Sequence, residues 1–294
     1  METKSSLYHD NPIWADVVPV TLPQQRGDPF FVDYTPEYID LMGYFLAVLE
    51  KNEVSERALE IADRVLRKFP SHYSAWWYKY FILENIGFDF EKELETLSQF
   101  AKEAPKSFQV WHYREWLVDK APSKPNEIDF LRIIFDIDAK NYHAWSYVVW
   151  LAGRWNMHED IYQLALHYIE VDMRNNSAWN IRRHMADYLG KDPKSEFQDA
   201  SNSLQTVAKN EAVINFLFSY AEKYPELDEK LLEISESLIL KNPENPHAYR
   251  IKMFYLSPRN KEDEIKHICS KLVEIDPIRK NYYNLIIEGK LKFR

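Results

Sequence analysis

Basic side chains recur at one position of a pattern that repeats along the chain. Each lies five residues before a recurrent aromatic or apolar residue, just ahead of a predicted helix start: Lys106, Lys140, Arg174 and Lys209. A helix N-terminus already carries a partial positive charge, so a cation there costs roughly 0.3–1 kcal/mol. Because basic residues recur at this unfavourable position, they are interpreted as a shared rim of positive charge that can bind an anion. The alternative, preferred for Lys106 and Lys209, is that long basic side chains bend into solvent, where salt screens the penalty.

The composition excludes several classes of function. The 294 residues include 37 basic and 46 acidic ones, and a net charge of −9 opposes binding to nucleic acid or anionic lipid. The single cysteine, Cys269, excludes an internal disulfide framework, and without HExxH or CxxC we expect this chain alone to bind no metal. The N-terminus lacks the apolar core of a secretory signal, and no apolar run reaches 18 residues. These features predict a soluble, cytoplasmic protein without a membrane span.

The elements that position the basic residues repeat every 34 to 35 residues. The recurrent bulky residue marks seven copies: Trp76, Trp111, Trp145, Trp179, Ile214, Tyr249 and Tyr283. With only six glycines in the chain, tight hairpins between strands are disfavoured, and helical hairpins are the better expectation. One helical hairpin of this length cannot bury its apolar face alone, so the copies stack. We therefore predict an all-α fold, a right-handed superhelical solenoid in which the recurrent rings fill the shared core.

Helix boundaries are marked within each copy. The second helix of a copy is predicted to start at a capping or turn residue: Ser71, Ser107, Asn141, Asn175 and Asn245. Prolines fall in the link before it, where the first helix must end: Pro70, Pro105, Pro243 and Pro277. Apolar residues at helical spacing from Leu227 to Ile239 indicate a first helix.

The N-terminal part of the chain has a different composition. Prolines at 12, 19, 23 and 29 predict an extended arm over residues 1–34. A capping helix over residues 36–50 is expected next, followed by the seven helix pairs, so that residues 35–294 form a single helical-repeat domain.

The repeated segments resemble a known family. A tetratricopeptide array has a similar period but carries its Trp in the first helix, whereas here Trp follows an Asn or Ser start in the second. The segments KNYHAW (140–145), RNNSAW (174–179) and KSFQVWHYREW (106–116) are similar to the protein prenyltransferase α-subunit repeat. WADVVPV (14–20), SERALEI (55–61) and IRKNYY (278–283) resemble signatures of the subunit shared by farnesyltransferase and type I geranylgeranyltransferase. The likeness covers about residues 14–287.

Two features depart from the family pattern. The Arg expected three residues after each Trp is kept as Arg114 and Arg182, is replaced by Lys at 79 and 252, and is lost as Val148. The fifth copy has Ile214 in place of Trp. Both are interpreted as variation in the core.

The resemblance implies a reaction and a partner. A farnesyl or geranylgeranyl diphosphate alkylates the thiolate of a C-terminal CaaX cysteine, and a β subunit holds the zinc and most of the isoprenoid pocket. Mg²⁺ can accompany the diphosphate. Lys140 matches the family Lys that reaches the diphosphate, where a cation stabilises charge on the leaving oxygens.

The resemblance also gives candidate substrate-binding residues. Tyr142 matches an aromatic near isoprenoid and peptide, and packing on the next copy is the alternative for it. Asn141 and Asn175 are interpreted first as helix caps and second as contacts with the partner or the substrate. His143 and Arg174 complete the set, while no catalytic role is assigned to His112, His184 or His247.

Two other functions remain open at this level. The α subunit of Rab geranylgeranyltransferase has similar repeats, although WADVVPV and SERALEI favour the first interpretation. A helical-repeat adaptor without a part in catalysis is the second alternative, and the KNYHAW motif argues against it.

Overall fold

The computed structural model describes residues 7–22 and 32–293, and this part of the chain is helical without a strand. The α-helices are α1 Pro36–Glu50, α2 Glu56–Lys68, α3 Tyr73–Ile86, α4 Phe90–Glu103, α5 Phe108–Asp119, α6 Glu127–Ile137, α7 Tyr142–Trp155, α8 His158–Val171, α9 Asn176–Leu189, α10 Pro193–Thr206, α11 Glu211–Lys223, α12 Asp228–Lys241, α13 Pro246–Leu256, α14 Glu262–Ile275 and α15 Lys280–Ile287. Short 3-10 helices are η1 Tyr8–Asp10, η2 Pro12–Trp14, η3 Pro225–Leu227, η4 Ser257–Arg259 and η5 Pro277–Arg279. None of these helices has the length and apolarity that would let it span a membrane.

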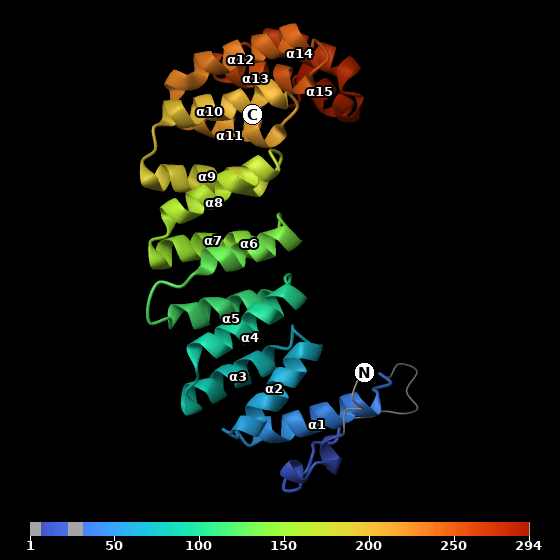
Figure 1. The fold of residues 1–294 in the computed structure, drawn as a ribbon. Helices are drawn as coiled ribbons and strands as arrows, with labels where there is room; N and C mark the ends of the chain where they lie inside the picture. Colours follow the sequence, from blue (N-terminus) through green and yellow to red (C-terminus); the bar gives the residue numbers. More distant parts are fainter. Residues whose placement is uncertain (1–6, 23–31, 294) are drawn as a thin grey trace. The chain divides into compact units, whose positions relative to one another are not determined.

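Successive helices form hairpins, from α2 with α3 to α14 with α15 (Figure 1). The chain divides into two compact units, Met1–Tyr147 and Val148–Arg294, and the division falls within α7. The prediction of an all-α fold of stacked helix pairs is confirmed in both, and α1 coincides with the range predicted for the capping helix.

In the first unit, a carbonyl oxygen in the link between the two helices of a repeat accepts hydrogen bonds both from its own repeat and from the next one. The Pro105 oxygen accepts hydrogen bonds from the indole N–H of Trp111 at 2.8 Å and from the amide N–H of Asn141 at 2.9 Å. The Pro70 oxygen accepts from the Trp76 indole at 2.7 Å and from the Ser107 hydroxyl at 3.0 Å. The recurrent Trp therefore fixes its own link, and the following repeat binds to the same point.

The second unit repeats this arrangement with variations. The Met173 oxygen accepts from the Trp179 indole at 2.9 Å and from the Asn210 amide at 2.6 Å. In the sixth repeat the Tyr249 hydroxyl replaces the indole and donates to the Pro243 oxygen at 3.0 Å. Tyr can therefore substitute for Trp because its hydroxyl reaches the same carbonyl.

The structure refines two of the predicted capping or turn residues. The cap of α3 is His72 and not Ser71, because the His72 Nδ1 accepts from the Ala75 N–H at 3.1 Å while Ser71 is exposed one residue earlier. Ser107 occupies the cap position of α5, but its hydroxyl makes no capping bond and donates to Pro70 instead. The caps at Asn141, Asn175 and Asn245 are confirmed.

Buried ion pairs connect neighbouring repeats. Arg114 on α5 donates two hydrogen bonds to Glu127 on α6, at 2.7 and 2.8 Å, and both side chains are 1% exposed. The Tyr147 hydroxyl donates to the same carboxylate at 2.8 Å. Equivalent pairs join Lys79 to Glu93 and Arg182 to Glu196. The basic residue three positions after the Trp is thus a contact between repeats.

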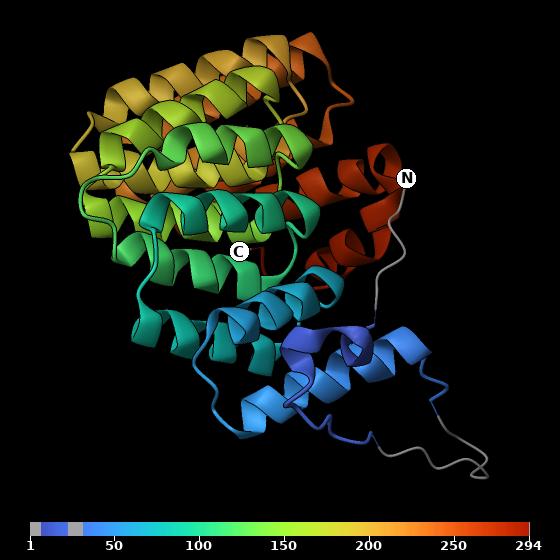
Figure 2. The same ribbon diagram turned by 60° about the horizontal axis from the view of Figure 1, so that its bottom comes forward.

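Residues 7–22 pack against the first helices (Figure 2). The Asp40 carboxylate of α1 accepts from the Tyr8 N–H at 2.6 Å, and Trp14 is buried beneath the guanidinium of Arg57. The Val20 N–H donates to the Gly43 oxygen at 3.0 Å, and a side chain at Gly43 would meet the Val20 oxygen. The boundary of the arm at residue 34 stays a prediction, and Pro23 and Pro29 lie outside the described residues.

Candidate functional site

The link between α6 and α7 carries the KNYHAW motif. The Asp138 carboxylate accepts from the Lys140 backbone N–H at 3.1 Å, and the Asp138 carbonyl accepts from the Asn141 N–H at 3.0 Å. The Trp145 indole donates to the Ala139 oxygen at 2.9 Å. These bonds fix the backbone at Lys140, which is itself an exposed residue.

Asn141 is buried, and both the oxygen and the nitrogen of its side-chain amide form hydrogen bonds within the protein. Its oxygen accepts from the Ala144 N–H at 2.9 Å, and its nitrogen donates to Pro105. Asn175 is also buried, and its oxygen accepts from the N–H groups of Ser177 and Ala178. Both residues hold a link in position. A substrate contact for either residue stays a prediction, and with these bonds in place it would act through the link.

Tyr142 is 77% exposed at the first position of α7, and the ring of His143 stands edge-on to it at 5.6 Å. Packing of Tyr142 into the stack is therefore wrong, since its ring stays largely in solvent. His143 is half-buried. The Tyr142 ring is thus accessible at the start of α7, and its contact with a substrate stays a prediction.

Two further exposed rings occupy the same position as Tyr142 in their repeats. Tyr73 and Phe108 each lie three residues before the recurrent Trp and are the first residues of α3 and α5. Both are exposed, and Phe108 stacks on His112 with the ring centres 5.9 Å apart. We call Tyr73, Phe108 and Tyr142 the aromatic row. The sequence analysis missed it, although the offset from the Trp was available as a signal.

Lys106 belongs to the link between α4 and α5, and its side chain lies near the link between α6 and α7 that carries Lys140. Its side chain is 83% exposed, and its Nζ is 3.9 Å from the Asp138 carboxylate, an ion pair that is too long and too exposed to hold the side chain. The Asp138 carboxylate therefore contacts both residues, through the backbone N–H of Lys140 and the ammonium group of Lys106.

Arg174 and Lys209 belong to the second unit. Arg174 is exposed, and its backbone N–H donates to Asp172 at 2.8 Å, as Lys140 does to Asp138 in the first unit. Lys209 is exposed one residue before the Asn210 cap of α11. Lys140 in the first unit and Arg174 in the second thus share one local backbone geometry.

Lys140 and Tyr142 are exposed. Two cavities of about 340 Å³ lie elsewhere, one against α13 and α15 and one against α2 and α4, and neither is lined by Lys140 or Tyr142. Among the described residues no group of three or more His, Cys, Asp or Glu could hold a metal. Burial raises the pKa of the Cys269 thiol to about 11, so this cysteine is not a thiolate at neutral pH.

Comparisons with known proteins agree with the geometry of the repeats. The protein prenyltransferase alpha subunit repeat matches residues 55–86, 90–121 and 125–155, which contain the first three hairpins. The α subunit of protein farnesyltransferase/geranylgeranyltransferase type-1 from Dictyostelium discoideum is 30% identical over 94% of this chain and 92% of its own length. The corresponding subunit from Candida albicans is 30% identical over 36% of this chain, and that match spans 35% of its length.

A solved structure gives the same result for the fold. A chain of Candida albicans protein geranylgeranyltransferase-I complexed with GGPP superimposes with a TM-score of 0.85 and 25% identity. The superposition covers 94% of the present chain and 98% of the other. It confirms the predicted helical-repeat fold class.

Proposed function

Since the chain belongs to the family of protein farnesyltransferase/geranylgeranyltransferase type-1 α subunits, we propose that it is the α subunit of a heterodimeric CaaX prenyltransferase. The observation that carries this proposal is the likeness to the Dictyostelium discoideum subunit over nearly the whole chain. The proposed reaction transfers a farnesyl or geranylgeranyl group to a C-terminal cysteine of a target protein, in the cytoplasm.

In this reaction the cysteine sulfur attacks the first carbon of the prenyl group, and the bond to the diphosphate oxygen breaks. Negative charge grows on the departing diphosphate, so a fixed cation beside it lowers the barrier, most strongly where water is excluded. Lys140 is the proposed cation, held by the bonds of its link to Asp138. Its open position fits a role that is completed only when a second polypeptide covers it.

The aromatic row supports assembly with a β subunit. Tyr73, Phe108 and Tyr142 expose large rings at equivalent positions of consecutive repeats. Aromatic residues are enriched in the cores of protein interfaces. We propose that this row contacts the partner, with Tyr142 and His143 nearest the substrates and Arg174 as a further contact for the diphosphate.

Zinc belongs to the partner in this proposal. The described residues of this chain do not fit a zinc site, because they contain no group of three suitable ligands and Cys269 is buried as a thiol. Mg²⁺ with the diphosphate is assigned to the substrate side. The contribution of this chain is therefore to scaffold the β subunit and to place a cation.

The test is co-expression with the β subunit from the same source, followed by assay of a CaaX peptide with each prenyl diphosphate. Lys140→Ala should lower the rate of prenyl transfer by about 10²-fold or more, the size expected when a charge-stabilising donor is lost. Assembly should be unchanged, because the side chain of Lys140 makes no part of the stacked core.

Lys106→Ala is the matched variant, since it removes the same charge from the adjacent link. If Lys106→Ala lowers turnover and Lys140→Ala does not, the cation at the diphosphate is Lys106 and the assignment of Lys140 is wrong. A wild-type heterodimer that prenylates no CaaX peptide, or a chain that pairs with no β subunit, would refute the proposed function and favour the adaptor.

A further inference from the structure

The carboxylate two residues before Lys140 binds to the backbone of that lysine. Asp138 is the C-cap of α6, and its side-chain oxygen accepts a hydrogen bond from the Lys140 N–H at 3.1 Å. Such a bond from an Asp or Asn side chain to the backbone two residues later is an Asx turn. A negative charge at a helix C-terminus is opposed by the helix dipole, so Asp138 does not stabilise α6 through its charge. The side chain of Asp138 therefore acts on the link that follows the helix.

The link itself forms without this bond. The residue seven positions before the recurrent bulky residue is Phe69, Ala104 and Val207 in the first, second and fifth repeats, and none of these side chains can accept a hydrogen bond. Their backbone φ angles are −135°, −132° and −130°, close to the −148° of Asp138. The Asx turn at Asp138 is therefore an addition to a backbone that stacking and the helix end already specify.

The Asx turn separates the four predicted cations into two pairs. In the fourth repeat the Asp172 carboxylate accepts from the Arg174 N–H at 2.8 Å, which repeats the arrangement at Lys140. The links of Lys106 and Lys209 have Ala and Val at the corresponding position. Within the described residues, no side chain accepts a hydrogen bond from the backbone N–H of either of these two lysines. The cations of the KNYHAW and RNNSAW motifs are thus the two whose backbone an acidic side chain holds.

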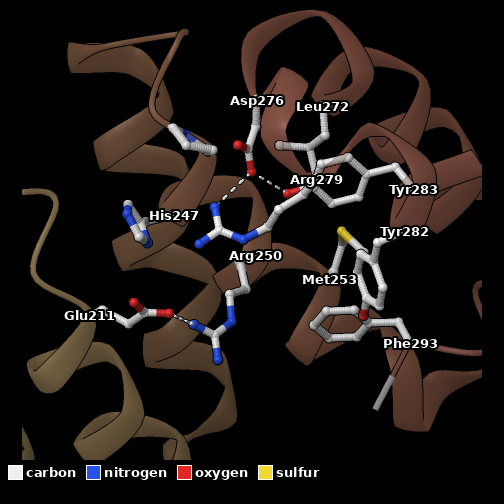
Figure 3. A pocket seen from close by; sticks show the side chains of 11 residues that line it. Glu211, His247, Arg250, Met253, Leu272, Asp276, Arg279, Tyr282, Tyr283 and Phe293 are labelled. Atoms are coloured by element: carbon white, nitrogen blue, oxygen red, sulfur yellow. Dashed lines mark hydrogen bonds and ion pairs between the residues drawn. The ribbon is translucent and has the colours of Figure 1, made fainter.

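An Asp at this position can also bind to other groups. In the seventh repeat the equivalent residue is Asp276, whose carboxylate accepts from the Arg279 guanidinium at 3.0 Å and from the Tyr283 hydroxyl at 2.6 Å (Figure 3). There the carboxylate holds the charged end of a basic side chain. The Asp138 carboxylate reaches the main chain of Lys140. The residue type alone does not select between these two uses.

We propose that Asp138 is a positioning residue that presents Lys140 to the departing diphosphate. The Asx turn fixes the backbone of Lys140 and with it the direction of the Cα–Cβ bond from which the side chain extends. A cation that starts from a fixed point has less to reorganise as charge develops on the leaving oxygens, and a preorganised charge lowers the barrier more. The inference rests on the proposed function, because it takes Lys140 as the cation at the diphosphate.

The test measures the single-turnover rate of prenyl transfer to a CaaX peptide by the heterodimer with its β subunit. Asp138→Ala should lower this rate about two- to tenfold, the effect of losing one hydrogen bond. Asp138→Asn should keep at least the wild-type rate, because an amide oxygen can accept the same bond. The chain itself contains this substitution, since the Asn242 oxygen accepts from the Glu244 N–H at 3.0 Å in the sixth repeat. A wild-type rate in Asp138→Ala would overturn the inference.

A double-mutant cycle shows whether Asp138 acts through Lys140. In a Lys140→Ala background, Asp138→Ala should cause no further loss of rate, because the group that it positions is gone. An equal loss in both backgrounds would overturn the inference. The Asp138 carboxylate also lies 3.9 Å from the Lys106 Nζ, so the cycle is repeated with Lys106→Ala present. If the loss in Asp138→Ala disappears there, Asp138 acts through Lys106 and the inference is equally wrong.

Asn242→Ala is the matched control, since it removes the same turn from a link that carries Glu244 in place of a cation. It should leave the rate unchanged. If it lowers the rate as much as Asp138→Ala does, or if Asp138→Ala does not fold, the turn serves the links in general and the inference is overturned. A wild-type heterodimer without CaaX activity would refute the proposed function as well, whereas an active wild type with an unaffected Asp138→Ala variant overturns the inference alone.

Discussion

The second and third repeats use the same buried position in opposite ways. In the second repeat, the residue three positions after the Trp is Arg114, which pairs with Glu127 on the next first helix. In the third repeat the corresponding residues are Val148 and Ile161, and both are fully buried. The loss of the Arg at Val148 is thus matched by the loss of the carboxylate at the position that would have faced it.

The difference shows that, in the first five repeats, the charge at this buried position is kept or lost together with its partner. A single charge left in the core has no water to solvate it, so removing one partner is far more costly than removing both. The fifth repeat follows the third, with Leu217 and Leu231 at the two positions, both buried. The variation in the core at Val148 is therefore accompanied by a matching change at Ile161 on α8.

The largest effect is expected from breaking the pair in the second repeat. Arg114→Met should lower the free energy of unfolding by about 3–5 kcal/mol, because Glu127 would be left buried with only the Tyr147 hydroxyl as a donor. Chemical denaturation followed by circular dichroism measures this loss. Val148→Met is the control, since it changes an apolar core residue without leaving a charge, and an equal loss in both variants would contradict the account.

The second repeat should tolerate conversion to the apolar type. Arg114→Met combined with Glu127→Leu should recover most of the loss, leaving the unfolding free energy within about 1–2 kcal/mol of the wild type. The double-mutant cycle isolates the coupling between the two side chains. Additive losses would mean that each residue acts through other contacts, such as Arg114 with the Phe130 ring, and that the pair is not the unit of change.

A pair in the same unit that is only partly buried should give the smallest effect. Arg57 and Ser55 donate hydrogen bonds to Glu53 and hold its pKa below the ordinary value of 4.5. A carboxylate with a lowered folded pKa stabilises the protein above its ordinary pKa, and this stability is lost as the pH falls through the folded pKa. Because the pair is partly solvated, the gain is about 1 kcal/mol or less.

Glu53→Gln tests this expectation through the pH dependence of unfolding. The difference in unfolding free energy between wild type and variant should be constant at neutral pH and shrink below pH 4.5. If Glu53→Gln lowered the free energy of unfolding as much as Arg114→Met, burial would not be what distinguishes the Glu53–Arg57 pair from the Arg114–Glu127 pair.

The sequence by itself determined the period, the helical hairpins and the candidate link. A ring every 34 to 35 residues with Asn or Ser before it specifies where helices begin, since capping and apolar periodicity act over a few neighbouring residues. The same local information identified KNYHAW and the caps at Asn141 and Asn175. It placed one cap a residue early, because His72 can also accept a capping hydrogen bond.

Only the tertiary structure decided which groups meet across repeats. The Pro105 oxygen joins Trp111 and Asn141, and Arg114 reaches Glu127, because stacking brings residues 13 to 36 positions apart into contact. The exposure of Tyr142 and the convergence of Arg250 and Arg279 on one pocket were equally invisible from the chain. A residue type fixes what a side chain can donate or accept, but the packing of the repeats decides which partner, or which open surface, it faces.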